Sequence, residues 1–332
     1  MSPREEYLTL FDLSTARALE FGPADRPWIP RETPGIRYID HLSTEDLRKK
    51  MQSSPLYKPD DLCDIHFVSD GRPLKAILED WIDLDLIVAS HVVEHVPDLL
   101  GWLLDLSSVL ASDGRIMLAA PNKAYIFDFL RRITTVEDVI ANYLQHRTKP
   151  SPTAILEHIS LISTNAGAIT WSEEADSSKL ARMHQPGEAY KLASDHVDDN
   201  SSYVDVHVSI FTPYSFVQIL AGLTVNGFLP LELERIDENG FEFLVVLKRC
   251  VADERIPERV AALEKIAAKL PFRIRDYYAA EFVWREPRLR NFGAIDETAL
   301  AKQQLEVELA RLKGSASWRI TKPLRGLRRL FH

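Results

Sequence analysis

The stretch Ala18-Leu19-Glu20-Phe21-Gly22-Pro23-Ala24-Asp25, followed shortly by Arg37-Tyr38-Ile39-Asp40, decides the fold of this chain. The order predicts a short apolar strand, a tight turn at Gly22, the start of a helix, and a second strand that ends in an acid. An acid at the tip of the second strand of an α/β unit can accept hydrogen bonds from both hydroxyls of a ribose. Gly22 lets a ligand approach the backbone at the end of the first strand. Together these residues predict a nucleoside-containing cofactor.

The turn after the first strand indicates which cofactor this is. A dinucleotide fingerprint, G-x-G-x-x-G, needs its glycines so that a pyrophosphate can lie on a helix N-terminus. This chain has Gly22 followed by Pro23-Ala24-Asp25-Arg26-Pro27, which is too bulky and too acidic to cradle a diphosphate. A cofactor with a positive charge and no phosphate suits the turn better, and S-adenosylmethionine (SAM) is such a cofactor. The alternative is an ordinary corner between a strand and a helix.

Further strands and helices continue the α/β pattern along the chain. Strands are predicted, in chain order, at residues 64–68, 85–90, 115–120, 229–233 and 241–247. The apolar, β-branched run 85–90 is typical of a parallel strand buried on both faces. Helices are predicted from Pro97 and from Thr212-Pro213, and a short Asn-Gly loop joins the last two strands as a hairpin. The sequence therefore predicts an α/β fold with a doubly wound, Rossmann-like sheet, mostly parallel, with an antiparallel closing hairpin.

Length, charge and cysteine content limit the class of protein. The chain has 332 residues, a formal net charge of −9 and two cysteines, Cys63 and Cys250. The acidic balance argues against nucleic acid as a partner, because phosphate binding needs a basic face. Two distant cysteines predict neither a disulfide framework nor a cysteine zinc site. A polar N-terminus and the absence of a long apolar run predict a cytoplasmic protein without a signal peptide or a spanning helix.

Changes in composition divide the chain into segments. Residues 1–249 form the predicted main domain, and the acid-rich stretch 148–210 within it is expected to be an insertion or lid. Residues 250–314 predict a helical extension. Residues 315–332 have no acid and mix apolar with basic side chains, which favours docking on an anionic membrane surface or an acidic partner. The alternative is that this basic end folds back onto the acidic body of the same chain.

The segment Ser90-His91-Val92-Val93-Glu94-His95 follows the central strand, at the sheet edge where open α/β sheets bind ligands. Its H-x-x-E-H spacing is formally a zinc signature. That chemistry needs both histidines on one face of a helix, whereas here they lie in a turn, so no metal is predicted. Methyl transfer to a hydroxyl needs a base, and histidine is the natural base near neutral pH. His95 is the preferred candidate and His91 the second; the alternative is that either side chain merely caps or packs the loop.

Several motifs resemble those of class I SAM-dependent methyltransferases. Glu20-x-Gly22-x-Ala24 is similar to the first motif of that family, E-x-G-x-G, with Ala in place of the second Gly. Glu94-His95 resembles the acidic-His pair after the fourth strand, and the closing hairpin resembles the end of the family's sheet. The whole set, over roughly residues 15–249, resembles a bacterial subgroup found alongside glycosyltransferases in cell-surface polysaccharide synthesis. It also includes Tyr38-x-Asp40-His41, Pro121-Asn122-Lys123-x-Tyr125-x-Phe127-Asp128, and Asp205-x-His207 before Phe211-Thr212-Pro213.

The resemblance implies SAM as the cofactor and a sugar or glycan as the methyl acceptor. The cofactor is then expected in the loops after the first four strands, at Glu20, Phe21, Gly22, Pro23, Ala24, Asp40, His41, Asp70, Ser90 and Glu94. The acceptor is expected at the polar and aromatic segment after the next strand and at the insertion. Its candidate residues are Asn122, Lys123, Tyr125, Asp128, Arg131, His158 and His207.

Residues 317–325 resemble a C-terminal signature of glycosyltransferases and methyltransferases of surface-glycan assembly, which implies a glycosyltransferase or a membrane surface as partner. The leading hypothesis is a cytoplasmic methyltransferase, peripheral at the membrane, that O-methylates a sugar or glycan. Ala24 and the bulky Asp25-Arg26-Pro27 turn favour an alternative, a methyltransferase-fold scaffold that has lost catalysis. An NAD-dependent sugar enzyme ranks last, because the glycines and a Tyr-x-x-x-Lys pair near a Ser are missing.

Overall fold

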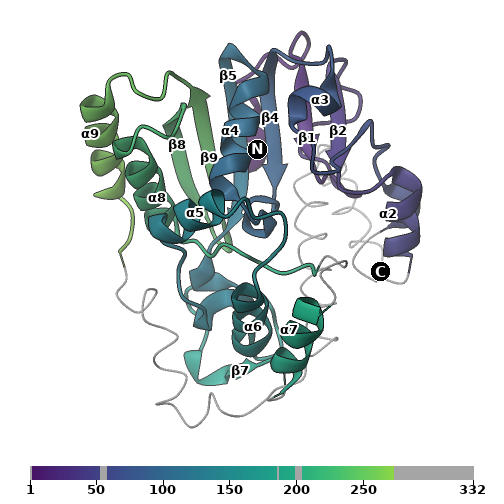
Figure 1. Ribbon diagram of the computed structural model, residues 1–332, viewed down its shortest axis with the longest axis vertical. Coiled ribbons are helices and arrows are strands. Elements are labelled where there is room, and N and C mark those ends of the chain that lie inside the picture. Colours follow the sequence, from purple (N-terminus) through teal and green to yellow (C-terminus); the bar gives the residue numbers. More distant parts are fainter. Residues whose placement is uncertain (1, 53–57, 185–186, 199–203, 273–332) are drawn as a thin grey trace, which may run out of the picture.

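A computed structural model describes residues 2–52, 58–184, 187–198 and 204–272 of the chain (Figure 1). The basic end at 315–332 lies outside the described residues, as does the part of the predicted helical extension after residue 272. Among the described residues, a large sheet with its helices forms one body. A smaller lobe lies below the sheet in Figure 1.

The main body is built on a seven-stranded sheet with the order β3-β2-β1-β4-β5-β9-β8. The first five strands in this order are parallel, β9 is antiparallel to β5, and β8 pairs with β9 as a hairpin. The predicted fold class is confirmed. The strands are β1 (Ala18–Phe21), β2 (Ile36–Asp40), β3 (Phe67–Val68), β4 (Leu84–Ser90), β5 (Leu110–Pro121), β8 (Leu231–Asn239) and β9 (Glu242–Arg249).

Two apolar layers cover the two faces of this sheet. Alternate residues of a strand point to opposite faces, so Ile87 of β4 joins one layer and Val88 the other. The first layer receives side chains from α3 (Leu74–Leu78), α4 (Leu99–Val109), α5 (Val136–Leu144), α8 (Pro213–Val225) and α9 (Ile256–Ala267). The second receives Tyr7 of α1 (Pro3–Leu8) together with Trp28 and Ile29 of a loop. The helix α2 (Thr44–Met51) follows β2.

The helix predicted to begin after Gly22 does not form. Residues 22–35, all of them described, form a loop between β1 and β2. The loop contains Pro23, Pro27, Pro30 and Pro34, and proline inside a helix removes a backbone donor and clashes with the preceding turn. Instead, the carboxylate of Glu20 accepts hydrogen bonds from the backbone N–H groups of Trp28 (2.6 Å) and Ile29 (2.9 Å). These bonds hold the loop against the sheet.

The other predicted elements form with small shifts at their ends. The helix predicted from Pro97 begins at Leu99, because the Asp98 side chain caps it by accepting from the Gly101 N–H (2.8 Å). The helix predicted from Thr212-Pro213 is α8, with Thr212 as its N-cap. The strand predicted at 64–68 shortens to Phe67–Val68. Short 3₁₀ helices also occur: η1 (Pro59–Asp61), η2 (Val93–His95), η3 (Lys123–Tyr125), η4 (Phe127–Leu130) and η5 (Ser177–Lys179).

The smaller lobe comes from the stretch predicted as an insertion or lid. It contains α6 (Pro152–Leu161), α7 (Glu188–Asp198) and the antiparallel pair β6 (Ser163–Asn165) and β7 (Leu180–Arg182). Ile155 of α6, Ala193 of α7 and Val206 form a small apolar core. The parallel strands of the sheet point toward this lobe (Figure 1), so the lobe faces the carboxyl edge of the sheet.

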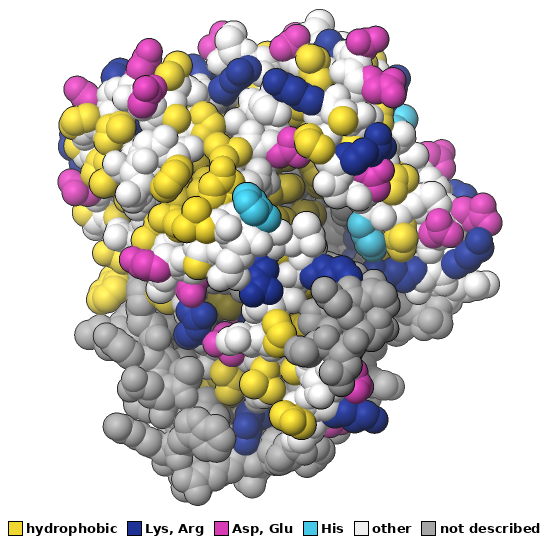
Figure 2. Space-filling model, in the orientation of Figure 1, with side chains coloured by type: hydrophobic (Ala, Val, Ile, Leu, Met, Phe, Trp, Pro, Cys, Tyr) yellow, Lys and Arg dark blue, Asp and Glu magenta, His cyan; other side chains and the backbone are white. Residues whose placement is uncertain are grey.

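The described surface has an apolar area on the helical side of the sheet. Figure 2 shows hydrophobic side chains gathered over α5, α8 and β8, where Leu144 is 68% and Val225 is 58% exposed. None of the described helices is both long enough and apolar enough to cross a membrane.

Candidate active site

The turn after β1 and the loop after β4 meet at the carboxyl edge of the sheet. Gly22 has a left-handed backbone (φ +60°), which glycine adopts without strain. A Cβ atom at this position would lie 3.2 Å from Cγ2 of Val92 in the loop after β4. The two loops are therefore packed closely, and glycine lets them approach.

Asp40 lies at the end of β2, beside this turn. The Gly22 N–H donates to the carbonyl of Ile39 (3.0 Å), which holds the two strand ends together. Asp40 is largely buried, and its Oδ1 accepts from the His41 N–H (2.7 Å) and pairs with His41 Nδ1 (2.5 Å). Exposed Asp70, after β3, pairs with Arg72 (2.8 Å). The carboxylate of Asp40 thus stands where the sequence predicts a ribose.

Glu20 and its neighbours are used to build the loop itself. Burial raises the pKa of Glu20 to about 7, although the N–H groups of Trp28 and Ile29 oppose this rise. The Phe21 ring packs edge-on against Trp102 of α4, with 5.8 Å between centroids. The Pro23 carbonyl accepts from the Arg26 N–H and the Ala24 carbonyl from the Cys63 N–H. These residues, predicted to contact a cofactor, make contacts within the protein.

His91 begins the loop after β4, where Ser90 ends the strand, and it has a left-handed backbone (φ +54°) that is unusual for a side chain of its size. Its Nε2 lies 3.0 Å from Glu242 Oε2, and its Nδ1 lies 3.4 Å from Glu94 Oε1. Burial alone would lower the pKa of His91, but the two carboxylates outweigh it and raise the pKa to about 9. His91 is therefore a cation near neutral pH.

Glu242, the first residue of β9, completes this group of charges from the far side. Its carboxylate also pairs with Arg4 (2.5 Å) and accepts from Asn239 Nδ2 (2.7 Å). Burial acts to raise the pKa of Glu242, but His91 and Arg4 lower it to about 2. The sequence reasoning did not single out Glu242 or Arg4. The sequence does contain one feature that could have indicated Glu242: it is a carboxylate within the apolar run of the last strand.

Glu94 is the most deeply buried carboxylate of the site. It lies in η2 with no exposed surface, and neither of its oxygens makes a hydrogen bond within the described residues. Its backbone carbonyl accepts from the N–H groups of Val208 (2.7 Å) and Ser209 (3.0 Å), which ties the β4 loop to the segment after the lobe. Burial acts to raise the pKa of Glu94, but the imidazoles of His91, His207 and His95 outweigh it and lower the pKa.

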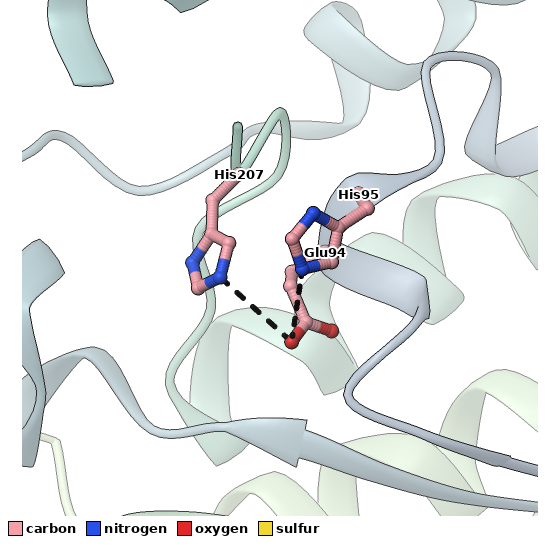
Figure 3. A group of neighbouring side chains, drawn as sticks. All are labelled: Glu94, His95 and His207. Carbon is pink, nitrogen blue, oxygen red and sulfur yellow. Dashed lines mark ion pairs between the residues drawn. The ribbon is translucent and has the colours of Figure 1, made fainter. Parts of the chain in front are cut away.

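Two further imidazoles face Glu94, one from the loop and one from the segment after the lobe. Nε2 of His95 and Nε2 of His207 each lie 3.9 Å from Glu94 Oε1, and the two rings lie 4.7 Å apart (Figure 3). His95 Nδ1 lies 2.9 Å from Asp205 Oδ1. This contact lowers the pKa of Asp205 to about 2. Burial opposes a charged His95, but Asp205 and Glu94 raise its pKa.

The other partner of His207 is a buried ion pair. His207 Nδ1 lies 2.5 Å from Asp128 Oδ2, and Asp128 Oδ1 pairs with Arg131 at 2.8 Å. Burial acts to raise the pKa of Asp128, but His207 and Arg131 hold it well below its usual range. His158 of α6 lies 3.3 Å from the Arg131 guanidinium, and burial together with that charge lowers the pKa of His158 to about 3. The structure thus brings these predicted acceptor residues beside the predicted base.

Three other predicted acceptor residues serve the segment after β5. Asn122 is buried and its Oδ1 accepts from the Ala124 N–H (3.2 Å). Lys123 has no exposed surface, and its ammonium group donates to the carbonyl of Phe129. Tyr125 is also buried. The side chain of Lys123 turns inward and holds residues 123–130 together.

Comparison with known proteins gives structural likeness alone. No protein family model matches the sequence, and no curated protein matches it. The mitomycin 7-O-methyltransferase MmcR is similar at 14% identity and a TM-score of 0.33, over 72% of this chain and 51% of that one. A SAM-dependent methyltransferase from Aquifex aeolicus is similar at 13% identity and a TM-score of 0.36, over 75% of this chain and 90% of that one. Human N-acetylserotonin methyltransferase is similar at 11% identity and a TM-score of 0.34, over 74% of this chain and 51% of that one.

This chain therefore spans about half the length of the first and third of these structures. Because the TM-scores lie below 0.5, the assignment of the fold rests on the strand order and the strand directions given above.

Proposed function

We propose that this protein is a SAM-dependent methyltransferase that transfers the methyl group to a hydroxyl of a sugar or glycan. One observation carries the proposal. The carboxyl edge of a mostly parallel sheet brings the Gly22 turn and Asp40 close to a loop that holds two half-exposed imidazoles among buried carboxylates. A nucleoside cofactor and a proton-accepting group are needed at the same edge for this reaction, and both have candidates there.

The residues at the edge fit the cofactor in part. Asp40 is an acceptor of hydrogen bonds only, as the ribose hydroxyls require, whereas the space beside Gly22 is occupied by Val92 of the loop after β4. When bound, SAM supplies the methyl group on a positively charged sulfur. The acidic turn at Pro23-Ala24-Asp25 suits that charge better than it suits a diphosphate.

His95 is the proposed base for the acceptor hydroxyl. Its Nδ1 lies 2.9 Å from Asp205 Oδ1, and its Nε2 lies 3.9 Å from Glu94 Oε1 inside the site. His91 is less suited to this role, because its pKa of about 9 keeps it protonated near neutral pH. In the reaction the hydroxyl proton passes to His95, the oxygen bonds to the methyl carbon, and the carbon–sulfur bond breaks to leave S-adenosylhomocysteine.

A second candidate function is a binding protein with this fold and no catalysis. The loop 22–35 favours it, because this loop replaces the helix whose N-terminus would follow the glycine turn. Glu20, at the first position of the motif, is occupied by the backbone of the same loop. Such a protein would serve as a scaffold in a glycan-assembly complex.

Calorimetric titration with SAM and with S-adenosylhomocysteine tests the proposal. We expect both ligands to bind, and Asp40→Ala to weaken binding by about 1.5–3 kcal/mol, the value of a hydrogen bond to a charged group. Asp113→Ala is the control, since that carboxylate is 87% exposed at the opposite edge of the sheet. A folded wild-type protein that shows no heat with SAM would support the scaffold instead. Equal affinities of the Asp40 variant and the wild type would contradict the ribose contact.

The proposal also includes a location. A sugar or glycan acceptor, a glycosyltransferase partner and a place at the inner face of the membrane are supported by the motif resemblance and by the basic, acid-free residues 315–332. Those residues lie outside the described part of the chain.

A further inference from the structure

We propose that Glu94, His95 and His207 bind a divalent transition-metal ion. One oxygen or nitrogen of each of the three side chains lies within 4.8 Å of the others, and Figure 3 shows them pointing toward a common point. The sequence argument against a metal considered His91, Glu94 and His95 alone. In the structure His91 turns toward Glu242, and His207, more than one hundred residues later, takes the third position.

The partner of His207 supports this assignment. Histidines that bind metals usually donate the N–H of their other ring nitrogen to a carboxylate, which fixes the ring and its tautomer. His207 has such a partner, because its Nδ1 forms a hydrogen bond with Asp128 Oδ2 at 2.5 Å. With its proton on Nδ1, His207 presents the lone pair of Nε2 to Glu94 Oε1. Nε2 of His95 lies at the same distance from that oxygen, and its Nδ1 has Asp205 at 2.9 Å without the geometry of a hydrogen bond.

The carboxylate of Glu94 is the second, independent observation. It is fully buried, and neither oxygen makes a hydrogen bond among the described residues. A buried charge without such bonds is costly unless a cation compensates it. The His91 imidazole at 3.4 Å is the nearest protein cation. Among the described residues, Asp128 is paired with the Arg131 guanidinium, and Glu94 has His91 beside it without a hydrogen bond. A metal cation between Glu94, His95 and His207 would contact the Glu94 carboxylate directly.

The ligand types indicate the class of metal. Two imidazoles and one carboxylate suit zinc, cobalt or ferrous iron, whereas magnesium and calcium prefer oxygen ligands. Around a tetrahedral ion with bonds of about 2.1 Å, the ligand atoms lie about 3.4 Å apart. The present separations are 3.9 Å from Glu94 Oε1 to each imidazole and at most 4.8 Å within the group, so the side chains must approach one another by up to about 1.4 Å to reach that geometry. Three protein ligands leave a position open for a further oxygen.

The role of such an ion rests on the proposed function. A bound metal lowers the pKa of an oxygen that it contacts, so the acceptor hydroxyl would give its proton to solvent water, with no imidazole needed as the base. His95 would then be a ligand and not the proton acceptor. The two roles exclude each other, because Nε2 of His95 has one lone pair.

Metal binding is tested on the full chain without SAM, after treatment with a chelator. We expect Co²⁺ and Zn²⁺ each to bind at one ion per chain, as measured by calorimetry and by the visible spectrum of Co²⁺, and Mg²⁺ to bind at least 100-fold more weakly. His207→Ala and Glu94→Gln should lower the Co²⁺ affinity at least 100-fold. Asp205→Asn should lower it about tenfold, because it removes a negative charge 2.9 Å from Nδ1 of the proposed ligand His95. Asp205 is more than half exposed, so this variant is expected to fold.

His184→Ala is the matched control, since His184 pairs with Glu188 at 3.3 Å on the surface of the lobe. It should leave Co²⁺ binding unchanged. Circular dichroism confirms that each variant is folded. The site is overturned if Co²⁺ and Zn²⁺ do not bind, or if folded His207→Ala and Glu94→Gln bind them as the wild type does. SAM titration of the chelator-treated protein separates the two proposals, because the loss of SAM binding with metal binding intact contradicts the methyltransferase and not the metal site.

Discussion

Glu242 of β9 joins the N-terminal helix α1 to the loop after β4. It pairs with Arg4 and with His91, and it is 2% exposed. Its position at the start of β9 places a carboxylate directly beside the predicted site. The charged group at the edge of the sheet therefore includes a residue, Glu242, that lies far along the chain from residues 91–95.

The stability of the protein should depend on Glu242 in a pH-dependent way. The folded pKa of about 2 lies below the ordinary value of 4.5, so the contribution is present above pH 4.5 and is lost as the pH falls through 2. We expect Glu242→Gln to lower the free energy of unfolding by about 2–3 kcal/mol at pH 7 and by much less near pH 2.5. Urea denaturation across this range measures both values.

Glu258→Gln on α9 serves as the control for this experiment, because Glu258 is exposed. It should change the free energy of unfolding by less than about 0.5 kcal/mol at either pH. A Glu242 variant that is as stable as the wild type at pH 7 would contradict the prediction.

At the scale of elements, the packing of α5 on α8 depends on a glycine within a helix. A Cβ atom at Gly222 of α8 would lie 2.6 Å from Cγ2 and 3.0 Å from Cβ of Val136, the first residue of α5. Valine is stiff at χ1 and cannot swing aside. Glycine at this position therefore serves close packing, although it weakens the helix.

A double-mutant cycle tests this contact. Gly222→Ala would gain about 1 kcal/mol from helix propensity at an unconstrained site, but here we expect it to destabilise by about 1 kcal/mol. In a Val136→Ala background the same change should stabilise by up to about 1 kcal/mol, which gives an interaction energy of about 1–2 kcal/mol. Thermal or urea denaturation of the four proteins measures the cycle. Equal effects of Gly222→Ala in both backgrounds would show that the two helices do not meet as described.

Much of the sheet could be predicted from the sequence, because a strand buried on both faces leaves a local pattern. The run at 85–90, the strand at 115–120 and the hairpin at the end are read from consecutive apolar residues and turn signals. The prediction of a helix after Gly22 is wrong, because four prolines follow that glycine and oppose a helix there.

The candidate site could be predicted only in part. Residues 91–95 stand out because they follow a predicted central strand. The approach of His207 and Asp128, and the turn of His91 toward Glu242, depend on how the lobe folds back and on the strand order. No local spacing contains this information, so a motif argument that stays within H-x-x-E-H misses the third histidine.

At the scale of the whole molecule, the distribution of charge predicts where the protein is found. The chain is acidic, at −9, while residues 315–332 have basic side chains and no acid. Each basic residue near an anionic membrane surface contributes about 1 kcal/mol. The test is a variant of the full chain in which Ser replaces Arg325, Arg328 and Arg329. We expect this triple variant to bind phosphatidylserine vesicles about 100-fold more weakly than the wild type does, as measured by co-sedimentation.

The matched control for this charge change is Arg48, Lys49 and Lys50 replaced together by Ser. These three basic residues are exposed on α2, and their replacement removes the same amount of positive charge from the folded body. Vesicles of phosphatidylcholine alone should bind none of the proteins tightly. If both triple variants bind phosphatidylserine vesicles as the wild type does, residues 315–332 are not a membrane anchor.

The pairing of β5 with β9 has a consequence for biosynthesis. β5 ends at Pro121, but one of its two edges is completed only by β9, which begins at Glu242. While the ribosome makes the intervening chain, the apolar strand of the nascent protein displays unpaired backbone groups, which are a template for wrong pairing. Chaperone capture during translation should therefore centre on this strand and end when residue 249 has emerged.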